Sequence, residues 1–296
     1  MMGATDNKAV RLRTLLEEYP HTAALKNGTV HSGRISFEFI TYKPVWDGFR
    51  PMVRERAFDV SEMAIVTYLI AKSFNKPMVL LPAVTTGRFQ QPYAVFNAAR
   101  GTLTPADLPG RRVGIRSFTT TTGAWLRGIL ANDYGVDLDS VHWVTFEEPH
   151  VAEYDDRTER APPGKTILGM LLDGELDAVL GDTSSDPRVK PLFGDPAAAA
   201  QVWYRKHGVL PVNHMVVVSQ ELARTRPDIV AELFCLLQSS KKLGKPAGDP
   251  DPARFGIEAI RRPLDMIIDY AVQQHLIPRR FTVEELFDDN TRGLGS

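Results

Sequence analysis

One segment, residues 111–128 (RRVGIRSFTTTTGAWLRG), constrains the fold of this chain more than any other. Its apolar residues 113–115 predict a strand, and the apolar spacing after Gly123 is typical of a helix. Between them lie four consecutive threonines, which are Thr119, Thr120, Thr121 and Thr122. Because the N–H groups of a first helical turn lack intrahelical partners and the helix dipole is positive there, this arrangement predicts an anion site. Arg116, at the end of the strand, can pair with a carboxylate or phosphate through two parallel bonds; a simple threonine N-cap is the alternative.

Strand and helix patterns alternate along the rest of the chain, which indicates an α/β protein. The predicted strands cover residues 35–41, 78–84, 92–97, 113–115, 142–146, 176–180 and 215–218. The predicted helices cover residues 49–58, 61–74, 166–172, 220–243 and 264–276. This order predicts two α/β lobes, the first made of residues 1–98 plus 211–296 and the second of residues 99–210 inserted between them. A cleft between two such lobes is the expected ligand site.

Composition excludes several classes of protein. The 35 Lys and Arg residues nearly balance the 36 Asp and Glu residues, giving a net charge of −1, so charge offers no case for binding nucleic acid or an anionic membrane. No apolar run approaches the roughly 20 residues of a membrane span, and the first residues lack the apolar core of a secretory signal. We therefore expect a cytoplasmic protein. The one cysteine, Cys235, lies in a leucine-rich helical pattern that predicts a packed core thiol.

Several segments carry a resemblance to a known family. They read YPHTAALKNGTV (19–30), FDVSEMAIVTYLIAK (58–72), DLPGRRVGIRSF (107–118), TTGAWLRGIL (121–130), YGVDLDSVHWVT (134–145), LLDGELDAVLGD (171–182) and PVNHMVVV (211–218). On these segments the chain resembles the 4,5-dihydroxyphthalate decarboxylase family. The resemblance implies a two-lobed fold of the periplasmic-binding-protein type 2 class and removal of CO2 from a hydroxylated aromatic dicarboxylate. It departs from the family pattern at Pro20 and His21, where an Asp-Arg pair is expected, and at Gln90 and Gln91, where basic residues are expected, so the recognised ring substituents are open.

Loss of CO2 from an aromatic ring needs a proton at the carbon that carried the carboxylate. A ring hydroxyl ortho or para to that carbon can absorb the developing charge, so we expect no organic cofactor. The protein then supplies a general acid, for which His214 is the first candidate and His21 the second, because histidine titrates near neutral pH. Asp182, at the end of a predicted strand, is a candidate to orient a histidine or a phenolic hydroxyl. Each of the three also has a plain structural explanation, as a hinge, surface or turn residue.

Cationic and hydroxyl side chains are candidates to bind the substrate. Arg88 and Arg116 lie at strand ends and are expected to clamp carboxylates, with surface ion pairs as the alternative. The four threonines would hold one carboxylate as an anchor, and Ser61 could hold a second at the start of its predicted helix. Glu62 would repel an anion, so it would bind a phenol or an arginine. Trp125 could stack on an aromatic ring, although its helical spacing is more often a core pattern.

Other readings of the sequence remain. One is a non-catalytic solute-binding protein for a small aromatic carboxylate, and another is a different enzyme on the same fold, such as one making a thiamine-pyrimidine or menaquinone precursor. A divalent metal held by His21, His214 and one carboxylate is the alternative to metal-free chemistry. The segment from His142 to His150 matches no defensible ligand spacing. The apolar helical region near the C-terminus predicts a homodimer.

Overall fold

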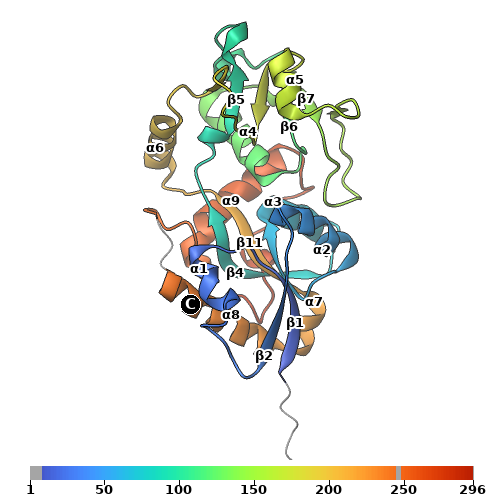
Figure 1. The fold of residues 1–296 in the computed structure, drawn as a ribbon, viewed down its shortest axis with the longest axis vertical. Helices are drawn as coiled ribbons and strands as arrows, with labels where there is room; N and C mark the ends of the chain where they lie inside the picture. Colours follow the sequence, from blue (N-terminus) through green and yellow to red (C-terminus); the bar gives the residue numbers. More distant parts are fainter. Residues whose placement is uncertain (1–8, 245–247, 296) are drawn as a thin grey trace, which may run out of the picture. The chain divides into compact units, whose positions relative to one another are not determined.

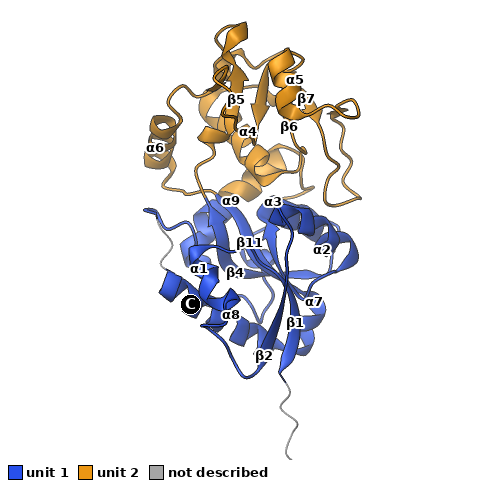
Figure 2. Ribbon diagram, viewed as in Figure 1, with its two compact units in different colours: residues 1–87, 212–265, 281–296 blue, residues 88–211, 266–280 orange. Residues whose placement is uncertain are grey.

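A computed structural model describes residues 9–244 and 248–295 of the chain. The chain folds into two compact units, each with its own β-sheet (Figures 1 and 2). Unit 1 contains residues 1–87, 212–265 and 281–296, and unit 2 contains residues 88–211 and 266–280. The chain therefore crosses from one unit to the other more than once, and each unit is built from segments distant in sequence.

The sheet of unit 1 has the strand order β2-β1-β3-β11-β4. Its strands are β1 (Val10–Leu15), β2 (Ile35–Ile40), β3 (Val60–Ala64), β4 (Met78–Gly87) and β11 (Val212–Ser219). Strand β1 is parallel to both β2 and β3, while β11 is antiparallel to both β3 and β4. As a result, the carboxyl ends of β1, β3 and β4 and the amino end of β11 lie at one edge of the sheet.

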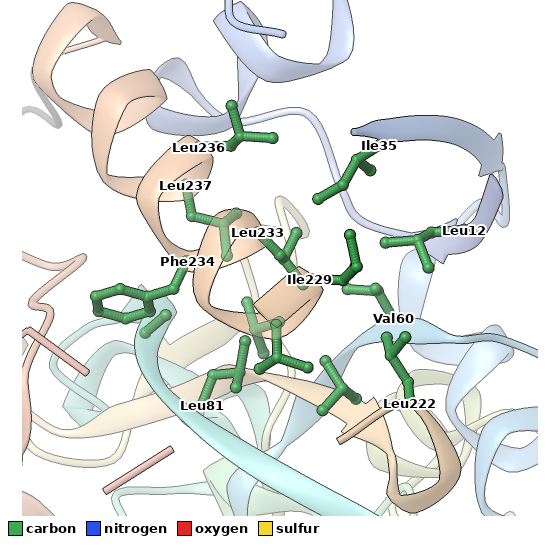
Figure 3. Close-up of a cluster of buried hydrophobic side chains, with 14 of the residues drawn as sticks. Leu12, Ile35, Val60, Leu81, Leu222, Ile229, Leu233, Phe234, Leu236 and Leu237 are labelled. Atoms are coloured by element: carbon green, nitrogen blue, oxygen red, sulfur yellow. The ribbon is translucent and has the colours of Figure 1, made fainter. Parts of the chain in front are cut away.

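Helices cover this sheet and bury its apolar side chains. They are α1 (Pro20–Lys26), α2 (Phe49–Glu55), α3 (Ile65–Ser73), α7 (Gln220–Thr225) and α8 (Pro227–Gly244). Figure 3 shows Ile229, Leu233 and Leu237 of α8 among apolar side chains from β1, β3 and β4, in a cluster of fully or almost fully buried residues. Burial of a leucine or isoleucine side chain stabilises by about 1.5–3 kcal/mol, so this cluster is a major part of the stability of unit 1.

The sheet of unit 2 has the order β10-β5-β9-β6-β7-β8. Its strands are β5 (Ala94–Asn97), β6 (Arg112–Ile115), β7 (His142–Thr145), β8 (Glu159–Arg160), β9 (Ala178–Leu180) and β10 (Val189–Pro191). Strands β6, β7, β8 and β9 run parallel, and β5 is antiparallel to β9. The carboxyl ends of β6 and β9 and the amino end of β5 consequently share one edge.

The helices of unit 2 are α4 (Thr121–Tyr134), α5 (Ile167–Asp173) and α6 (Pro196–His207). The long helix α9 (Ile257–Gln273) begins in unit 1 and belongs to unit 2 from Met266 onward. Its Tyr270 ring lies against Gly128 of α4, where an added Cβ would come within 2.0 Å of the ring. Glycine at this position is what allows α9 to approach α4 so closely.

Three expectations from the sequence need correction. Residues 61–64 are not the start of a helix but part of β3, because they pair with β11 and, at Ser61, with β1; the helix α3 begins at Ile65. Residues 88–98 and 266–280 belong to unit 2 rather than to the first lobe, because β5 pairs with β9 and Gln274 bonds to α4. Cys235 is exposed, since it lies on the face of α8 opposite the buried leucines.

No helix in the described part of the chain is long and apolar enough to span a membrane.

Candidate functional site

The edge of the unit 1 sheet gathers polar side chains at the carboxyl ends of its parallel strands. In α/β sheets this edge is the usual position of a ligand. His214 stands near the amino end of β11, opposite Ala64 of β3 and Thr86 of β4. The chain that leaves β1 brings Tyr19 and His21 to the same edge at the start of α1.

Glu62 is the centre of a hydrogen-bonded cluster. Its carboxylate is fully buried, and Oε1 lies 2.7 Å from Nδ1 of His214. The hydroxyl of Tyr19 donates to the same oxygen at 2.7 Å, and the backbone N–H of Glu17 donates to Oε2 at 3.2 Å. A buried carboxylate with three donors is the arrangement expected for a stable buried charge.

The charge state of Glu62 decides which nitrogen of His214 carries a proton. Burial opposes the charge, but the hydrogen bond and charge of His214 and the donors from Tyr19 and Glu17 outweigh it, so the pKa of Glu62 is lowered. An ionised carboxylate only accepts hydrogen bonds, so Nδ1 of His214 must be the protonated nitrogen that donates to it. Nε2 is then the nitrogen left to exchange a proton.

One further contact orients His214. The ring of Phe49 meets it edge-on, with centroids 5.1 Å apart and an interplanar angle of 88°. The side chain of His214 keeps 18% of its surface exposed, whereas that of Glu62 has none. Glu62 thus fixes the Nδ1 side of the histidine ring, while part of the ring remains accessible to solvent.

His21 lies in the same unit but in a different environment. Its ring stacks on Tyr19 at 5.1 Å and is buried. Burial lowers the pKa of His21, although a hydrogen bond with the Thr85 backbone and the charge of Glu62 act against the shift. Within the described chain its Nε2 is buried and has no hydrogen-bond partner. His21 is therefore a neutral histidine with one unsatisfied nitrogen, which favours a role in binding over one in proton supply.

The position of Tyr19 and His21 depends on close packing of α1 against α8. A Cβ on Gly244 would lie 1.7 Å from the carbonyl oxygen of Pro20, so only glycine fits there. The hydroxyl of Ser240 accepts a hydrogen bond from the N–H of Leu25 at 3.1 Å. These contacts fix the first turn of α1, from which the two aromatic side chains project.

A second group of polar side chains lies at the corresponding edge of the unit 2 sheet. The Arg88 guanidinium donates to the hydroxyl of Thr122 at 3.3 Å and stacks on the ring of Tyr93 at 4.1 Å. The N–H of Gly181, just after β9, donates to the carbonyl of Tyr93 at 2.7 Å. Arg88 and the first turn of α4 thus come together within unit 2, whereas the sequence places Arg88 in the first lobe.

The threonine segment forms a tight turn before α4. The hydroxyl of the N-cap residue Thr120 donates back to the carbonyl of Ser117 at 3.0 Å and gives the helix no side-chain cap. The hydroxyls of Ser117 and Thr119 are 3.1 Å apart, and both residues are buried. The expected strand–threonine–helix order is present, with β6 ending at Ile115 and α4 beginning at Thr121.

Other residues singled out from the sequence have different surroundings. Arg116 pairs with Glu147 at 3.6 Å, which is the ion-pair alternative. Asp182 accepts a hydrogen bond from the N–H of Thr183 at 2.8 Å, as a turn residue does, and the residue that orients a histidine is Glu62 instead. Ser61 is fully buried and bonds to the carbonyl of Glu62 at 2.6 Å, so it presents no hydroxyl at a helix start.

Trp125 is a core residue. It is fully buried and meets the rings of Trp203 and Tyr270 edge-on, at 6.3 and 5.6 Å. The expectation that it stacks on a ligand is wrong for this structure, because no part of the ring is exposed. Its helical spacing with Ile129 was the signal for packing.

The sequence does not predict the role of Tyr19 in the first group. Tyr19 is part of a family motif, but its position 43 residues before Glu62 hides the hydrogen bond that it donates. Gln91, where the family pattern predicts a basic residue, has both amide atoms buried and, among the described residues, without a hydrogen-bond partner.

Among residues 9–244 and 248–295, no group of three or more His, Cys, Asp or Glu side chains is arranged to hold a metal ion. His214 and Glu62 are joined to each other by a hydrogen bond.

Comparison with known proteins shows which sequences this chain resembles. No model of a known protein family matches the chain. It is 28% identical over 248 residues to a 4,5-dihydroxyphthalate decarboxylase of Comamonas testosteroni, across 78% of this chain and 75% of the relative. It is 29% identical over 212 residues to a 4,5-dihydroxyphthalate decarboxylase of Pseudomonas putida, across 66% of this chain and 82% of that relative. The chain is therefore similar in sequence to two proteins named 4,5-dihydroxyphthalate decarboxylase.

Solved structures show the fold. The alkanesulfonate-binding protein SsuA of Xanthomonas axonopodis matches with a TM-score of 0.56 and 13% identity, over 95% of this chain and 99% of that one. The aliphatic sulphonate binding protein SsuA of Escherichia coli matches with a TM-score of 0.55 and 12% identity, over 98% and 94%. The desulfurization enzyme DSZB matches with a TM-score of 0.55 and 13% identity, over 94% and 96%. The type 2 periplasmic-binding-protein fold predicted from the sequence is confirmed.

Proposed function

We propose that this relative of 4,5-dihydroxyphthalate decarboxylases removes CO2 from a hydroxylated aromatic dicarboxylate, with His214 delivering the proton. Two named decarboxylases with similar sequences support the reaction class. The observation that carries the proposal is the hydrogen bond between the buried carboxylate of Glu62 and the partly exposed ring of His214. A histidine braced by a carboxylate on one nitrogen is suited to proton transfer through the other.

The proposed chemistry balances without an oxidant or reductant. A substrate hydroxyl para to one carboxylate, once ionised, pushes electrons into the ring as it becomes a ketone. The ring carbon that bears the carboxylate then takes a proton. The bond from this carbon to the carboxylate breaks, CO2 leaves, and the electron pair restores the aromatic ring and the phenolate.

His214 supplies this proton from Nε2, and Glu62 stabilises the protonated ring before transfer. The negative charge of Glu62 also keeps Nδ1 protonated after transfer, so the same tautomer returns in each cycle. Tyr19 and the N–H of Glu17 hold the carboxylate in position for this role. No organic cofactor is part of the proposal.

The polar edge of unit 2 has a different part in the proposal, which is to bind a substrate carboxylate. Arg88 supplies a positive charge beside Thr122, and the first turn of α4 supplies the positive end of a helix dipole. This carboxylate stays on the product. If Arg88 and the helix dipole bound the other carboxylate, they would stabilise the negative charge that this group must lose when it leaves as CO2.

Turnover of 4,5-dihydroxyphthalate in D2O tests the proposal. We expect release of one CO2 per molecule and a product with one deuterium on the ring carbon that lost the carboxylate, seen by NMR. Unsubstituted phthalate, which has no hydroxyl that can become the ketone, is the control and should bind without turnover. Binding of both compounds with no CO2 from either would reject the decarboxylase and favour a solute-binding protein. Dialysis of the protein against a chelator before the assay tests whether turnover needs a metal, and loss of turnover would favour the alternative with a divalent metal.

A further inference from the structure

A buried arginine lies directly behind the threonine segment of unit 2. Arg127 is on α4, and its side chain has no exposed surface. Its Nη2 donates to the carbonyl of Phe118 at 2.7 Å, and the guanidinium stacks on the ring of Phe118 at 3.8 Å. Its Nε donates to Oε1 of Gln274 at 2.9 Å.

The surroundings of Arg127 hold it in place but leave its charge unbalanced. Gln274, which is neutral, is itself fixed by a hydrogen bond from its Nε2 to the carbonyl of Ala124 at 2.9 Å. In the described part of the chain Arg127 makes no ion pair, and its Nη1 is buried without a hydrogen-bond partner. Burial lowers the pKa of Arg127 to about 9, with Tyr154 and Asp156 acting weakly against the shift. The side chain is therefore still a cation at neutral pH.

An unpaired buried cation is costly, and an apolar side chain of similar size is usually neutral or stabilising in its place. Cation–π contacts with the rings of Phe118 and Trp143 recover only part of the free energy that burying an isolated ion costs. Packing alone therefore does not explain an arginine at this position. A negative charge that arrives with a ligand would explain it.

The unpaired nitrogen points to the start of α4. A Cβ added to Gly123, in the first turn, would lie 3.2 Å from Nη1 of Arg127 and 2.8 Å from Oγ1 of Thr120. The cation thus lies next to the first turn of α4. The hydroxyl of the N-cap residue Thr120 does not cap this turn, because it bonds to the carbonyl of Ser117. Its charge adds to the positive end of the helix dipole at that turn.

We propose that Arg127 is a positioning residue for a carboxylate bound at residues 117–122. Through its bond to the Phe118 carbonyl it fixes the shape of the turn, and through its unpaired charge it raises the affinity of the turn for an anion that it does not touch. The inference rests on the proposed function in that the anion is an aromatic carboxylate. The inference goes further by naming Arg127 as the source of positive charge for this carboxylate site.

Binding of phthalate, measured by titration calorimetry, tests the inference without turnover. Gln274→Glu places a carboxylate beside Arg127 and supplies the missing counter-charge. We expect this variant to be more stable than the parent protein and to bind phthalate about tenfold more weakly, because the new carboxylate cancels the positive charge at the start of α4. Arg127→Met removes the charge and should weaken binding to a similar degree.

Arg112→Met is the matched control. Arg112 lies at the opposite end of β6 from the threonine segment, and both of its Nη atoms bind Glu159 at 2.8 Å. Its loss should leave phthalate affinity within about twofold. The kinetics of 4,5-dihydroxyphthalate turnover give a second readout. Gln274→Glu should raise KM far more than it lowers kcat, whereas a general loss of structure would change both constants.

Unchanged phthalate affinity in Gln274→Glu would overturn the inference, even if Arg127→Met fails to fold. Absence of phthalate binding to the parent protein would overturn it as well. Phthalate binding that depends on Arg127, in a protein that releases no CO2 from 4,5-dihydroxyphthalate, would keep this inference and reject the decarboxylase proposal.

Discussion

Nδ1 of His214 lies 2.7 Å from Oε1 of Glu62, and the two residues come from antiparallel neighbouring strands, 152 positions apart in sequence. The pairing of β11 with β3 brings them together, so the geometry of this pair depends on the sheet and not on a flexible loop. A site built on strands holds its side chains more accurately than one built on loops.

His214→Asn should nearly abolish turnover. Asparagine retains a hydrogen bond to Glu62 but has no nitrogen that can deliver a proton. General acid catalysis contributes about 10²–10⁴ in rate, so kcat for 4,5-dihydroxyphthalate should fall by that factor while KM changes by only a few-fold. His31→Asn, at an exposed histidine of unit 1, is the control. Activity of His214→Asn within a few-fold of the parent protein would remove His214 as the proton donor.

Glu62→Gln should change the pH dependence of stability in a defined window. The folded-state pKa of Glu62 is below its ordinary value of 4.5, so the ionised carboxylate stabilises the fold above that pH. This contribution is lost as the pH falls through the folded-state pKa. The difference in unfolding free energy between the parent protein and Glu62→Gln should therefore shrink below about pH 4.5.

Urea denaturation at a series of pH values measures this difference. Both proteins are measured in a His21→Gln background, because the charge of Glu62 acts on the pKa of His21 and the contribution of His21 would otherwise not cancel. Glu55→Gln, at the end of α2, is an exposed control that should show no such window. A difference that does not shrink below about pH 4.5 would contradict the assignment of Glu62 as a buried anion.

Tyr19→Phe isolates one hydrogen bond of the cluster. The phenyl ring keeps the stacking on His21, while the donor to Oε1 of Glu62 is lost. We expect a loss of about 1–3 kcal/mol in unfolding free energy, the usual effect of removing one partner of a buried charged group. The pKa of Glu62 should rise, because the Tyr19 bond helps to lower it. Carboxyl chemical shifts followed by NMR during acid titration would show whether it does.

Arg88→Met tests the polar edge of unit 2. The methionine keeps apolar contact with Tyr93 but removes the charge beside Thr122. We expect KM for 4,5-dihydroxyphthalate to rise about tenfold or more, with a smaller change in kcat, because the arginine is proposed to bind a carboxylate that stays on the product. Arg205→Met, on the exposed end of α6, should leave KM unchanged. An equal fall in kcat with unchanged KM would place Arg88 in the chemical step instead.

The sequence allowed much of this arrangement to be predicted, where the signal was local. The order of strand, threonines and helix at residues 111–128 follows from apolar spacing and a glycine, and the structure has it. The segment FDVSEMAIV (58–66) predicts a helix that begins at Ser61 and Glu62, because a polar pair followed by an apolar run is typical of a helix start. Pairing with β11 on one side and β1 on the other overrides that local preference.

Long-range contacts were not predictable from spacing. The sequence predicts His214 as the general acid and Asp182 as the residue that orients a histidine. In the structure the carboxylate bonded to His214 is that of Glu62. Arg127 gave no signal in the sequence, because an arginine on a predicted amphipathic helix is normally exposed. Only tertiary structure shows that α9, through Gln274, covers that face of α4.

Gly123→Ala tests the tight turn before α4. Alanine at a helical position usually stabilises by about 1 kcal/mol over glycine. Here its Cβ would lie 2.1 Å from Cδ1 of Ile115, which is fully buried, and 2.8 Å from Oγ1 of Thr120. Overpacking of this kind costs about 1–3 kcal/mol, so we expect a net loss of stability and, because Thr120 must move, a higher Kd for phthalate. Gly33→Ala, with no atom within 4 Å of the new Cβ, should change neither quantity. A variant as stable as the parent protein, with the same Kd, would show that the turn yields easily and would weaken the case for a preformed carboxylate site.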